Sequence, residues 1–292
     1  MSPALPRVAF GLTFPNPLLL ASGTAGYGLE LEGVMALDRL GGLVTKAVSL
    51  APRAGNPPPR VAEVPGGMLN SVGLANPGLA AVVERDLPAL VRRLRGRGPR
   101  ILANVVGFEE GEYAEVVAGL EAVDGVDACE LNLSCPNTAA GGLEFGSDPG
   151  TVRRIVAACR AATRRPLVAK LSPAVPDLPA LAVAAVEAGA DGVTLVNTMP
   201  GLAYHRDGRP RLGQGNGGVS GPALLPVGLL AVRRVRERLP HTPILGVGGV
   251  RSAADVRDYL RAGATLVQVG TAALADPRVP ERILRDLERG DG

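Results

Sequence analysis

The sequence has very little of several residue types on which particular functions depend. Its 292 residues include no tryptophan, two histidines and three cysteines, and aromatic residues make up 3%. With so few stacking side chains and a net charge of only +3, the composition does not favour nucleic-acid binding. The cysteines Cys129, Cys135 and Cys159 are too few and too irregularly spaced for a disulfide framework or a four-thiolate cluster. We therefore expect the chain to hold no metal of its own.

Hydrophobic runs of the length that a bilayer requires are also missing. No apolar run approaches the roughly 18 residues of a membrane span, and residues 1–7 lack the charged and apolar regions of a signal peptide. The scarcity of cysteine suits a reducing compartment. We expect a cytoplasmic protein that does not associate with membranes.

Lysine is almost absent. Two of the 31 basic residues are lysines, Lys46 and Lys170, and the others are arginines. Each lysine ends a short apolar run that is typical of a buried parallel strand. Lysine is a compact ammonium that fits a tight pocket, whereas arginine is a wide planar fork. The two positions are therefore predicted to need an ammonium.

Short apolar runs and helix-like segments alternate along the whole chain. Eight runs have the length of a strand: residues 18–21, 43–46, 101–106, 128–132, 167–170, 193–197, 243–246 and 266–269. Helical spacing of apolar residues occurs between and after them, for example at 80–94, 152–162, 178–188, 224–239, 253–262 and 280–287. Eight such units, each a strand followed by a helix, predict an α/β fold: a single (β/α)8 TIM barrel domain spanning residues 1–292.

The connections distinguish the two ends of this barrel. Helix-to-strand connections are short, but three strand-to-helix loops are long, at residues 47–76, 133–148 and 198–221. All three lie at the carboxyl ends of the strands, where barrel enzymes place their active sites. The same end collects six polar residues: Ser22, Lys46, Asn104, Asn132, Lys170 and Asn197.

Two glycine-containing turns predict a phosphate site. Gly248 and Gly249 follow the seventh strand, and Gly270 and Thr271 follow the eighth, each before a helix. Barrels of this kind commonly bind phosphate at these two turns. Residues 213–218 match G-x-G-x-x-G, but they lie inside a loop with no strand before them, so we reject them as a dinucleotide fingerprint.

One cysteine is a candidate for catalysis. Cys135 lies in a polar loop just past the fourth strand, whereas Cys129 within a strand and Cys159 on a helix are typical buried thiols. His205 lies in the long sixth loop and His241 at the opposite end of the barrel, so neither is a predicted base. We expect no carboxylate at a strand end except those that neighbouring loops solvate. Cys135 is therefore predicted to move a proton.

Several motifs together resemble a known family. They are residues 45–47 (TKA), 55–60 (GNPPPR), 65–77 (PGGMLNSVGLANP), 132–137 (NLSCPN), 169–171 (AKL), 217–222 (GGVSGP) and 246–250 (GVGGV). The sequence resembles class 1 dihydroorotate dehydrogenases over nearly its whole length, and specifically the NAD-linked catalytic subunit of class 1B. Class 2 members differ by an amino-terminal membrane extension and by a serine in place of Cys135.

This resemblance implies FMN as the cofactor and a small planar substrate. The implied FMN phosphate site is Gly248, Gly249, Gly270 and Thr271, and the other implied FMN residues are Ser22, Lys46, Ala47, Asn104, Asn132, Lys170, Val196 and Gly221. Lys170 would lie beside the flavin's pyrimidine edge, and Lys46 would bridge flavin and substrate. The implied substrate residues are Lys46, Asn70, Ser71, Val72, Gly73, Leu74, Asn132, Asn197 and Thr198.

The implied reaction is the oxidation of dihydroorotate to orotate in de novo pyrimidine biosynthesis. Cys135 would act as general base at C5 of the substrate, and a hydride would pass from C6 to FMN. Because the chain has neither a dinucleotide fingerprint nor enough cysteines for a cluster, NAD reduction implies a second subunit. The family suggests one carrying FAD and a [2Fe-2S] cluster, in an assembly with two copies of each chain.

Three alternatives remain at this point. The first is a class 1A, fumarate-dependent dihydroorotate dehydrogenase, against which residues 45–47 and 55–60 argue. The second is an RNA-modifying enzyme that resembles the flavin-dependent dihydrouridine synthases, which carry an additional RNA-binding region. The third is a non-enzymatic flavin-binding or scaffold subunit, which would leave Cys135 and the three long loops unexplained.

Overall fold

A closed barrel of eight parallel strands forms the centre of the computed structural model, which describes residues 6–134, 136–137 and 143–290. The barrel strands are β3 (Leu18–Leu20), β4 (Gly42–Val44), β7 (Arg100–Val105), β8 (Ala128–Asn132), β11 (Leu167–Leu171), β12 (Gly192–Leu195), β15 (Ile244–Val247) and β16 (Leu266–Val269). Pairing of β16 with β3 closes the ring. All eight predicted strands are confirmed.

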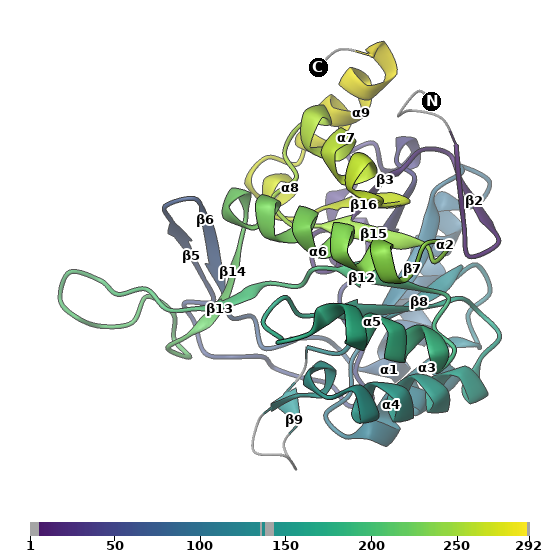
Figure 1. The fold of residues 1–292 in the computed structure, drawn as a ribbon, viewed down its shortest axis with the longest axis horizontal. Helices are drawn as coiled ribbons and strands as arrows, with labels where there is room; N and C mark the ends of the chain where they lie inside the picture. The colour runs from purple at the N-terminus through teal and green to yellow at the C-terminus, as the bar shows by residue number, and fades with distance from the viewer. Residues whose placement is uncertain (1–5, 135, 138–142, 291–292) are drawn as a thin grey trace.

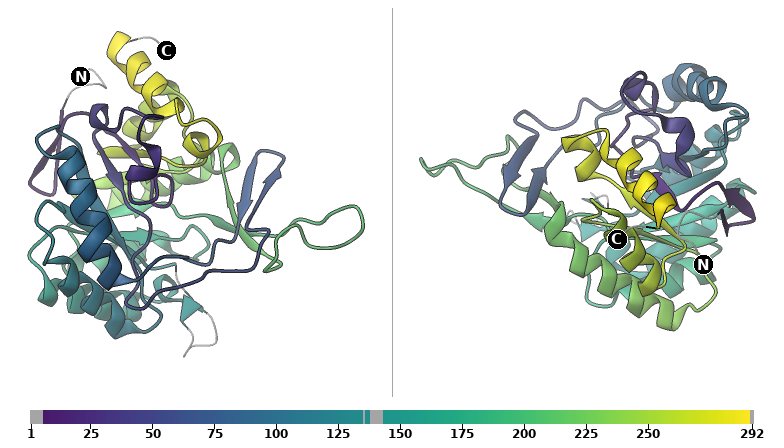
Figure 2. Two further views of the ribbon diagram at one scale, coloured as in Figure 1. Left: turned by 180° about the vertical axis from the view of Figure 1, so that it is seen from behind. Right: turned by 90° about the horizontal axis from the view of Figure 1, so that it is seen from above.

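Helices surround this barrel (Figure 1, Figure 2). They are α1 (Leu79–Ala81), α2 (Leu87–Leu94), α3 (Glu110–Leu120), α4 (Pro149–Ala162), α5 (Leu178–Glu187), α6 (Leu225–Arg238), α7 (Ala253–Ala262), α8 (Thr271–Ala275) and α9 (Val279–Arg289). Ser252 and Asp255 form a capping box at the start of α7, and Gly263 ends the helix in the left-handed conformation. No helix in the described part of the chain combines the length and apolar character needed to cross a membrane.

The first strand-to-strand connection departs from the predicted pattern of a strand followed by a helix. Between β3 and β4 the described chain forms two 3₁₀ turns, η1 (Leu29–Leu31) and η2 (Leu37–Arg39), instead of an α-helix. Four glycines in this stretch, Gly23, Gly26, Gly28 and Gly33, have positive φ values, which an α-helix does not accommodate.

An amino-terminal hairpin closes the bottom of the barrel. Its strands, β1 (Arg7–Ala9) and β2 (Leu12–Phe14), pair antiparallel and place Ala9 and Phe14 in a buried cluster with the lowest inward-facing barrel residues. Those barrel residues are Leu19, Val44, Leu102, Ala128, Val168, Leu245 and Leu266. Farther along β7, β8 and β11, the inward-facing residues become Asn104, Glu130 and Lys170. The barrel interior is thus apolar at one end and polar at the other.

All three long loops contain short strands that the sequence pattern did not predict. In residues 133–148, β9 (Pro136–Asn137) pairs antiparallel with β10 (Leu143–Glu144). β5 (Val61–Val64) and β6 (Gly67–Asn70) come from residues 47–76, and β13 (Met199–Gly201) and β14 (Gly217–Ser220) come from residues 198–221. They form one antiparallel sheet in the order β13, β14, β6, β5, which projects from the barrel (Figure 1). These strands are short and rich in glycine, and β6 pairs with a segment far away in the sequence. Local periodicity could not reveal them. The small sheet stands at the polar end of the barrel.

The β1–β2 hairpin, which we call the hairpin plug because it closes the apolar end of the barrel, provides the first testable prediction. Phe14 is 0% exposed, so Phe14→Ala should lower the free energy of unfolding by about 3–5 kcal/mol, because it removes a packed ring and leaves a cavity. Val8 in the same hairpin is 68% exposed, and Val8→Ala should change stability by less than about 0.5 kcal/mol. Urea unfolding of both variants measures this. Equal losses of unfolding free energy in the two variants would contradict the packing of Phe14 in the barrel.

Candidate active site

All eight barrel strands contribute predicted site residues to the polar end. Along the barrel these are Ser22 after β3, Lys46 and Ala47 after β4, Asn104 in β7, Asn132 at the end of β8, Lys170 in β11, Val196, Asn197 and Thr198 after β12, Gly248 and Gly249 after β15, and Gly270 and Thr271 after β16. From the small sheet, Gly221 follows β14, Asn70 ends β6, and Ser71, Val72, Gly73 and Leu74 follow β6. Residues scattered over 250 positions thus come to one end of the barrel. We call this end, with the residues listed above, the mouth.

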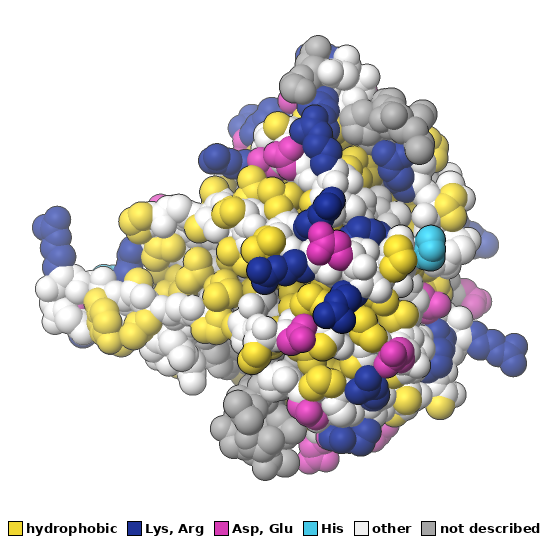
Figure 3. All heavy atoms as spheres, in the orientation of Figure 1, with side chains coloured by type: hydrophobic (Ala, Val, Ile, Leu, Met, Phe, Trp, Pro, Cys, Tyr) yellow, Lys and Arg dark blue, Asp and Glu magenta, His cyan; other side chains and the backbone are white. Residues whose placement is uncertain are grey.

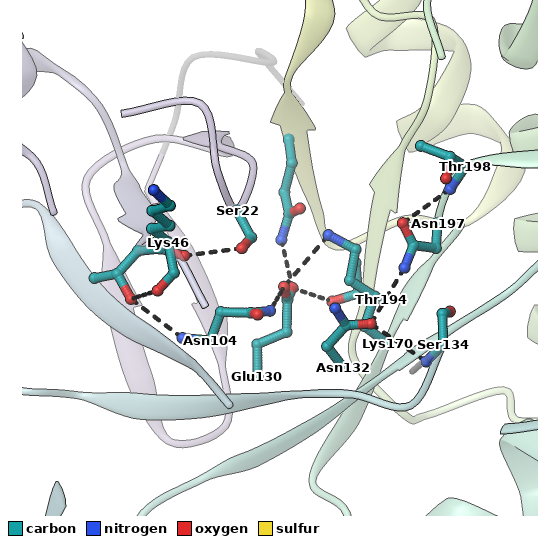
Figure 4. A network of polar contacts seen from close by, with 12 residues as sticks. Ser22, Lys46, Asn104, Glu130, Asn132, Ser134, Lys170, Thr194, Asn197 and Thr198 are labelled. Atoms are coloured by element: carbon teal, nitrogen blue, oxygen red, sulfur yellow. Dashed lines mark hydrogen bonds and ion pairs between the residues drawn. The ribbon is translucent and has the colours of Figure 1, made fainter. Parts of the chain in front are cut away.

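A buried carboxylate lies below this mouth and is the centre of a polar network (Figure 4). Glu130 is 0% exposed, and its Oε1 accepts hydrogen bonds from Asn104 Nδ2 at 2.9 Å and Lys170 Nζ at 3.4 Å. Its Oε2 accepts from Thr194 Oγ1 at 2.8 Å and Gln268 Nε2 at 3.0 Å. The donors come from four different strands. A carboxylate that accepts from four donors matches the ionised, acceptor-only form of the side chain.

Glu130 corrects one expectation from the sequence. A carboxylate at this end of the barrel was expected only where loops solvate it, but Glu130 is enclosed by the barrel strands. It alternates along β8 with Cys129 and Leu131, which lie in the core between barrel and helices. A charged residue inside an apolar strand was the available signal, because buried charges are rare unless paired. The same alternation identifies the inward face of β8.

The two lysines have different surroundings. Lys170 is 7% exposed and pairs with Glu130. Lys46 is half-buried, and among the described residues no hydrogen bond or ion pair engages its ammonium. In Figure 4 the Lys46 side chain points away from the Glu130 network. Lys170 is therefore a fixed cation at the floor of the mouth, and Lys46 is a cation available at its side.

Amide side chains line the mouth next to this network. Asn197 Nδ2 donates to Asn132 Oδ1 at 3.2 Å, and Asn197 Oδ1 accepts from the backbone of Thr198 at 2.9 Å. Asn70 Nδ2 donates to the carbonyl of Gly218, and a Cβ at Gly218 would lie 2.0 Å from Thr198 Oγ1. These contacts join the substrate residues predicted on β8, β12 and β6 into one polar surface. Asparagine offers both donors and acceptors to a ligand.

Two further asparagines, Asn56 and Asn76, hold the segment after β6 in place. The sequence analysis did not predict this role. Asn56 donates to Ser71 Oγ at 2.8 Å, and its backbone N–H donates to the carbonyl of Val72 at 3.1 Å. Asn76 donates to the carbonyl of Leu74 at 2.7 Å. Leu74 has a φ of 58°, a strained value for a branched residue. Anchors on both sides fix the shape of residues 70–74.

The two glycine turns fit a phosphate group. Gly248 and Gly249 have φ values of 121° and 76°, and a Cβ at Gly249 would lie 2.6 Å from the backbone nitrogen of Leu225. Gly270 is the N-cap of α8, and a glycine has no side chain to accept from the first N–H groups of the helix. Because β15 and β16 are neighbours in the barrel, the two turns lie side by side. Backbone N–H groups there can receive an anion.

A buried tyrosine supports the first of these turns. Tyr259 on α7 donates its hydroxyl to the carbonyl of Gly248 at 2.8 Å. Its ring packs so closely that a Cβ at Gly246 would lie 2.3 Å from it. Burial raises the pKa of Tyr259, and the charge of Asp255 raises it further. The hydroxyl therefore stays a donor at neutral pH and fixes the turn.

The predicted catalytic thiol, Cys135, lies outside the described residues, so its role stays a prediction. The other two cysteines are buried, and desolvation by burial raises the pKa of both Cys129 and Cys159 to about 12. His205 and His241 are exposed; His205 lies in the loop between β13 and β14, and His241 lies between α6 and β15. Within residues 6–134, 136–137 and 143–290, no group of three or more His, Cys, Asp or Glu side chains is arranged to hold a metal ion.

Comparisons with known proteins agree on one family. The family profile described as dihydroorotate dehydrogenase matches residues 5–290. A protein of Trichlorobacter lovleyi named "Dihydroorotate dehydrogenase B (NAD(+)), catalytic subunit" is 44% identical over 290 residues, which cover 99% of this chain and 94% of the relative. A protein of Pelobacter propionicus with the same name is 43% identical with the same coverage. A Solibacter usitatus protein named "Putative dihydroorotate dehydrogenase A (fumarate)" is 46% identical over 288 residues, 98% of this chain and 93% of the relative.

Thiol chemistry tests the burial of the two described cysteines. With a pKa of about 12, Cys129 and Cys159 should be only about 1 part in 10⁴ thiolate at pH 8, whereas an unfolded thiol is roughly one quarter ionised. Iodoacetamide should therefore label both only after unfolding, as measured by peptide mass spectrometry with and without urea. Labelling of either cysteine in the native chain within tenfold of the unfolded rate would show that its thiol is accessible.

Proposed function

The chain belongs to the dihydroorotate dehydrogenase family, and from this membership and the site we propose that it oxidises dihydroorotate to orotate in pyrimidine biosynthesis, with FMN as cofactor. The observation that carries the proposal is the composition of the barrel mouth. It combines two glycine turns after β15 and β16, whose backbone geometry suits an anion, with a buried ammonium, Lys170, on β11. A flavin mononucleotide has a phosphate at one end and an electron-accepting ring at the other.

The described residues fit FMN in three respects. Gly248, Gly249, Gly270 and Thr271 would hold the phosphate. Ser22, Ala47, Asn104, Asn132, Val196 and Gly221 would surround the remainder, together with Lys46. Lys170 would supply a fixed positive charge beside the pyrimidine edge, where charge develops as the ring is reduced. When bound, FMN accepts the hydride that the substrate gives up.

The substrate would lie among the amides of the mouth. Asn70, Asn132 and Asn197 can pair with the donors and acceptors of a dihydropyrimidine, and Ser71 to Leu74 would enclose it through their backbone groups. Lys46, whose ammonium has no partner among the described residues, would receive the substrate carboxylate or bridge to the flavin. The small sheet above would limit access of water. These residues bind and orient the ring.

Cys135 would take the proton from C5 of the bound substrate. The thiolate is the active form of such a base, and it becomes the thiol when it receives the proton. Neither histidine offers an alternative, because both are exposed and neither directly follows a barrel strand. Glu130 is already engaged by four donors below the mouth and is not free to accept a proton from the substrate.

The electrons would reach NAD through a second subunit. The relatives named "catalytic subunit" imply a separate electron-transfer chain, which we propose carries FAD and a [2Fe-2S] cluster in an assembly of two copies of each, in the cytoplasm. Hydrophobic side chains gather on the surface over the small sheet and α6 (Figure 3). On these elements and the loop after β13, the exposed hydrophobic residues include Val61 on β5, Leu230 on α6, and Leu202 and Tyr204 after β13, which a protein contact would bury.

Fumarate is the alternative electron acceptor. It is favoured by one observation, the 46% identity to the Solibacter usitatus protein whose name includes fumarate. A fumarate-dependent enzyme would work without the second subunit. The RNA-modifying and scaffold alternatives have no such support, since the family profile extends over residues 5–290.

Replacing the predicted base tests the reaction. Cys135→Ala should slow bleaching of bound FMN by dihydroorotate roughly 10²- to 10⁴-fold, as measured by anaerobic stopped-flow absorbance. Cys129→Ala and Cys159→Ala should bleach at nearly the wild-type rate, because both side chains are buried outside the mouth. The wild-type rate should rise with pH until the thiolate dominates, near pH ~8.5 for an unperturbed thiol. A wild-type rate in Cys135→Ala would refute the assignment.

The electron acceptor is tested with the isolated chain. Reconstituted with FMN alone, it should reduce an artificial dye with dihydroorotate but should form no NADH, because its sequence has no usable dinucleotide fingerprint and too few cysteines for an iron-sulfur cluster. Rapid turnover with fumarate would favour the alternative acceptor. Robust NADH formation by the metal-free chain would contradict the requirement for a second subunit, with Cys135→Ala as the inactive control.

A further inference from the structure

Glu130 lies just below the mouth, and the proposed reaction gives it no role. Its side chain is fully buried in the barrel interior, in direct contact with Asn104 and Lys170, two of the residues that would contact FMN. Burial of an ionised carboxylate is unfavourable unless it is paired and fully hydrogen-bonded. An apolar residue at this position would suit the core below it, which consists of aliphatic side chains and Phe14. The retention of a charge therefore requires an explanation.

The hydrogen bonds fix this carboxylate from four directions. Asn104 and Lys170 approach one oxygen, and Thr194 and Gln268 approach the other. These four donors use the acceptor positions that two carboxylate oxygens offer. Glu130 therefore cannot rotate without breaking several bonds, and it provides a rigid reference point for the Lys170 ammonium.

The charges in this layer form a single pair. Asn104, Thr194 and Gln268 are neutral, so Lys170 supplies the positive charge that faces Glu130 among the described residues. The Nζ to Oε1 distance of 3.4 Å is longer than the 2.7–2.9 Å of a tight charge-assisted bond. Lys170 is thus oriented by Glu130 but keeps donors for a group above it.

We propose that Glu130 is a positioning residue and counter-charge for Lys170 that sets the midpoint potential of the bound flavin. The inference rests on the proposed function, since it requires FMN above Lys170. A cation beside the flavin's pyrimidine edge favours the reduced form, and a carboxylate directly behind that cation opposes its field. The barrel interior thereby controls how strongly the bound cofactor attracts electrons.

The variant Glu130→Gln removes the charge and keeps the shape. Asn104 Oδ1 and Gln268 Oε1 are buried and have no hydrogen-bond partner in the part of the chain that the structure describes, so rotation of either amide can offer an acceptor to the new N–H₂ group. FMN in E130Q should have a more positive midpoint potential, with reduced FMN favoured over oxidised FMN at least tenfold more than in the wild type, which is about 30 mV for a two-electron couple. Inorganic sulfite, which adds to electron-poor flavins, should bind at least tenfold more tightly.

A matched control lies at the other end of the same strand. Asp127 precedes β8 and pairs with Arg100 at 2.9 Å, so Asp127→Asn also removes one charge from a carboxylate-cation pair. Its sulfite affinity should stay within twofold of wild type. The exchange variant E130Q/Q268E returns the charge to the same layer, because the two side chains are in contact at 3.0 Å, and it should reverse most of the shift.

The potential is measured by anaerobic dye-coupled titration and sulfite affinity by absorbance. An unchanged or more negative potential in E130Q, or no reversal in the exchange variant, overturns the inference. If E130Q does not fold, Glu130→Asp, which withdraws the carboxylate by one methylene, should raise the potential by a smaller step, and the absence of any rise overturns it. Wild-type FMN that dihydroorotate does not bleach would instead refute the proposed function, and this inference with it.

Discussion

One buried carboxylate organises the functional half of this barrel. Glu130 engages donors from four strands, so the polar layer can form only when those strands have their final register. The layer separates two environments. Below it, the β1–β2 hairpin and aliphatic side chains form an apolar core. Above it lie amides, glycine turns and Lys46, where we propose that the ligands bind. A misplaced strand would leave a charge buried without its partner, which is strongly destabilising. Stability and site geometry are thus tied to the same interaction.

Two kinds of group give the mouth a positive electrostatic potential: backbone N–H groups and a lysine ammonium. At the glycine turns it comes from backbone N–H groups, which a fixed backbone holds in place and which Tyr259 supports from behind. At the floor it comes from Lys170, whose position depends on Glu130. The first arrangement suits a permanent anion such as a phosphate. The second suits a group whose charge changes during a reaction, because the field of an ammonium can be balanced by a neighbouring carboxylate.

The parts of this structure that were predictable from the sequence are those encoded locally. Runs such as residues 167–170 identify strands because both faces of a parallel barrel strand are buried. The turn at Gly248 and Gly249 was predictable because a glycine pair follows a strand. The small sheet was not, since the pairing of Asn70 with Gly218 depends on tertiary contacts. The hydrogen-bond donors to Glu130 likewise come from four strands. Which inward-facing residues meet depends on how the barrel closes, so the sequence pattern does not reveal it. Cys135 remains a prediction from its loop and family.

The pairing of β6 with β14 has a consequence for synthesis on the ribosome. Asn70 and Gly218 are 148 residues apart, so at 5–20 residues per second the β5–β6 hairpin waits roughly 7–30 s for the strand that covers its open edge. An uncovered edge can recruit strands from other chains. Here β6 has only four residues and begins with a glycine, which leaves a nascent chain little edge to offer. Because β6 is short, it could not be predicted from the sequence. The same shortness limits association of the incomplete chain with other chains.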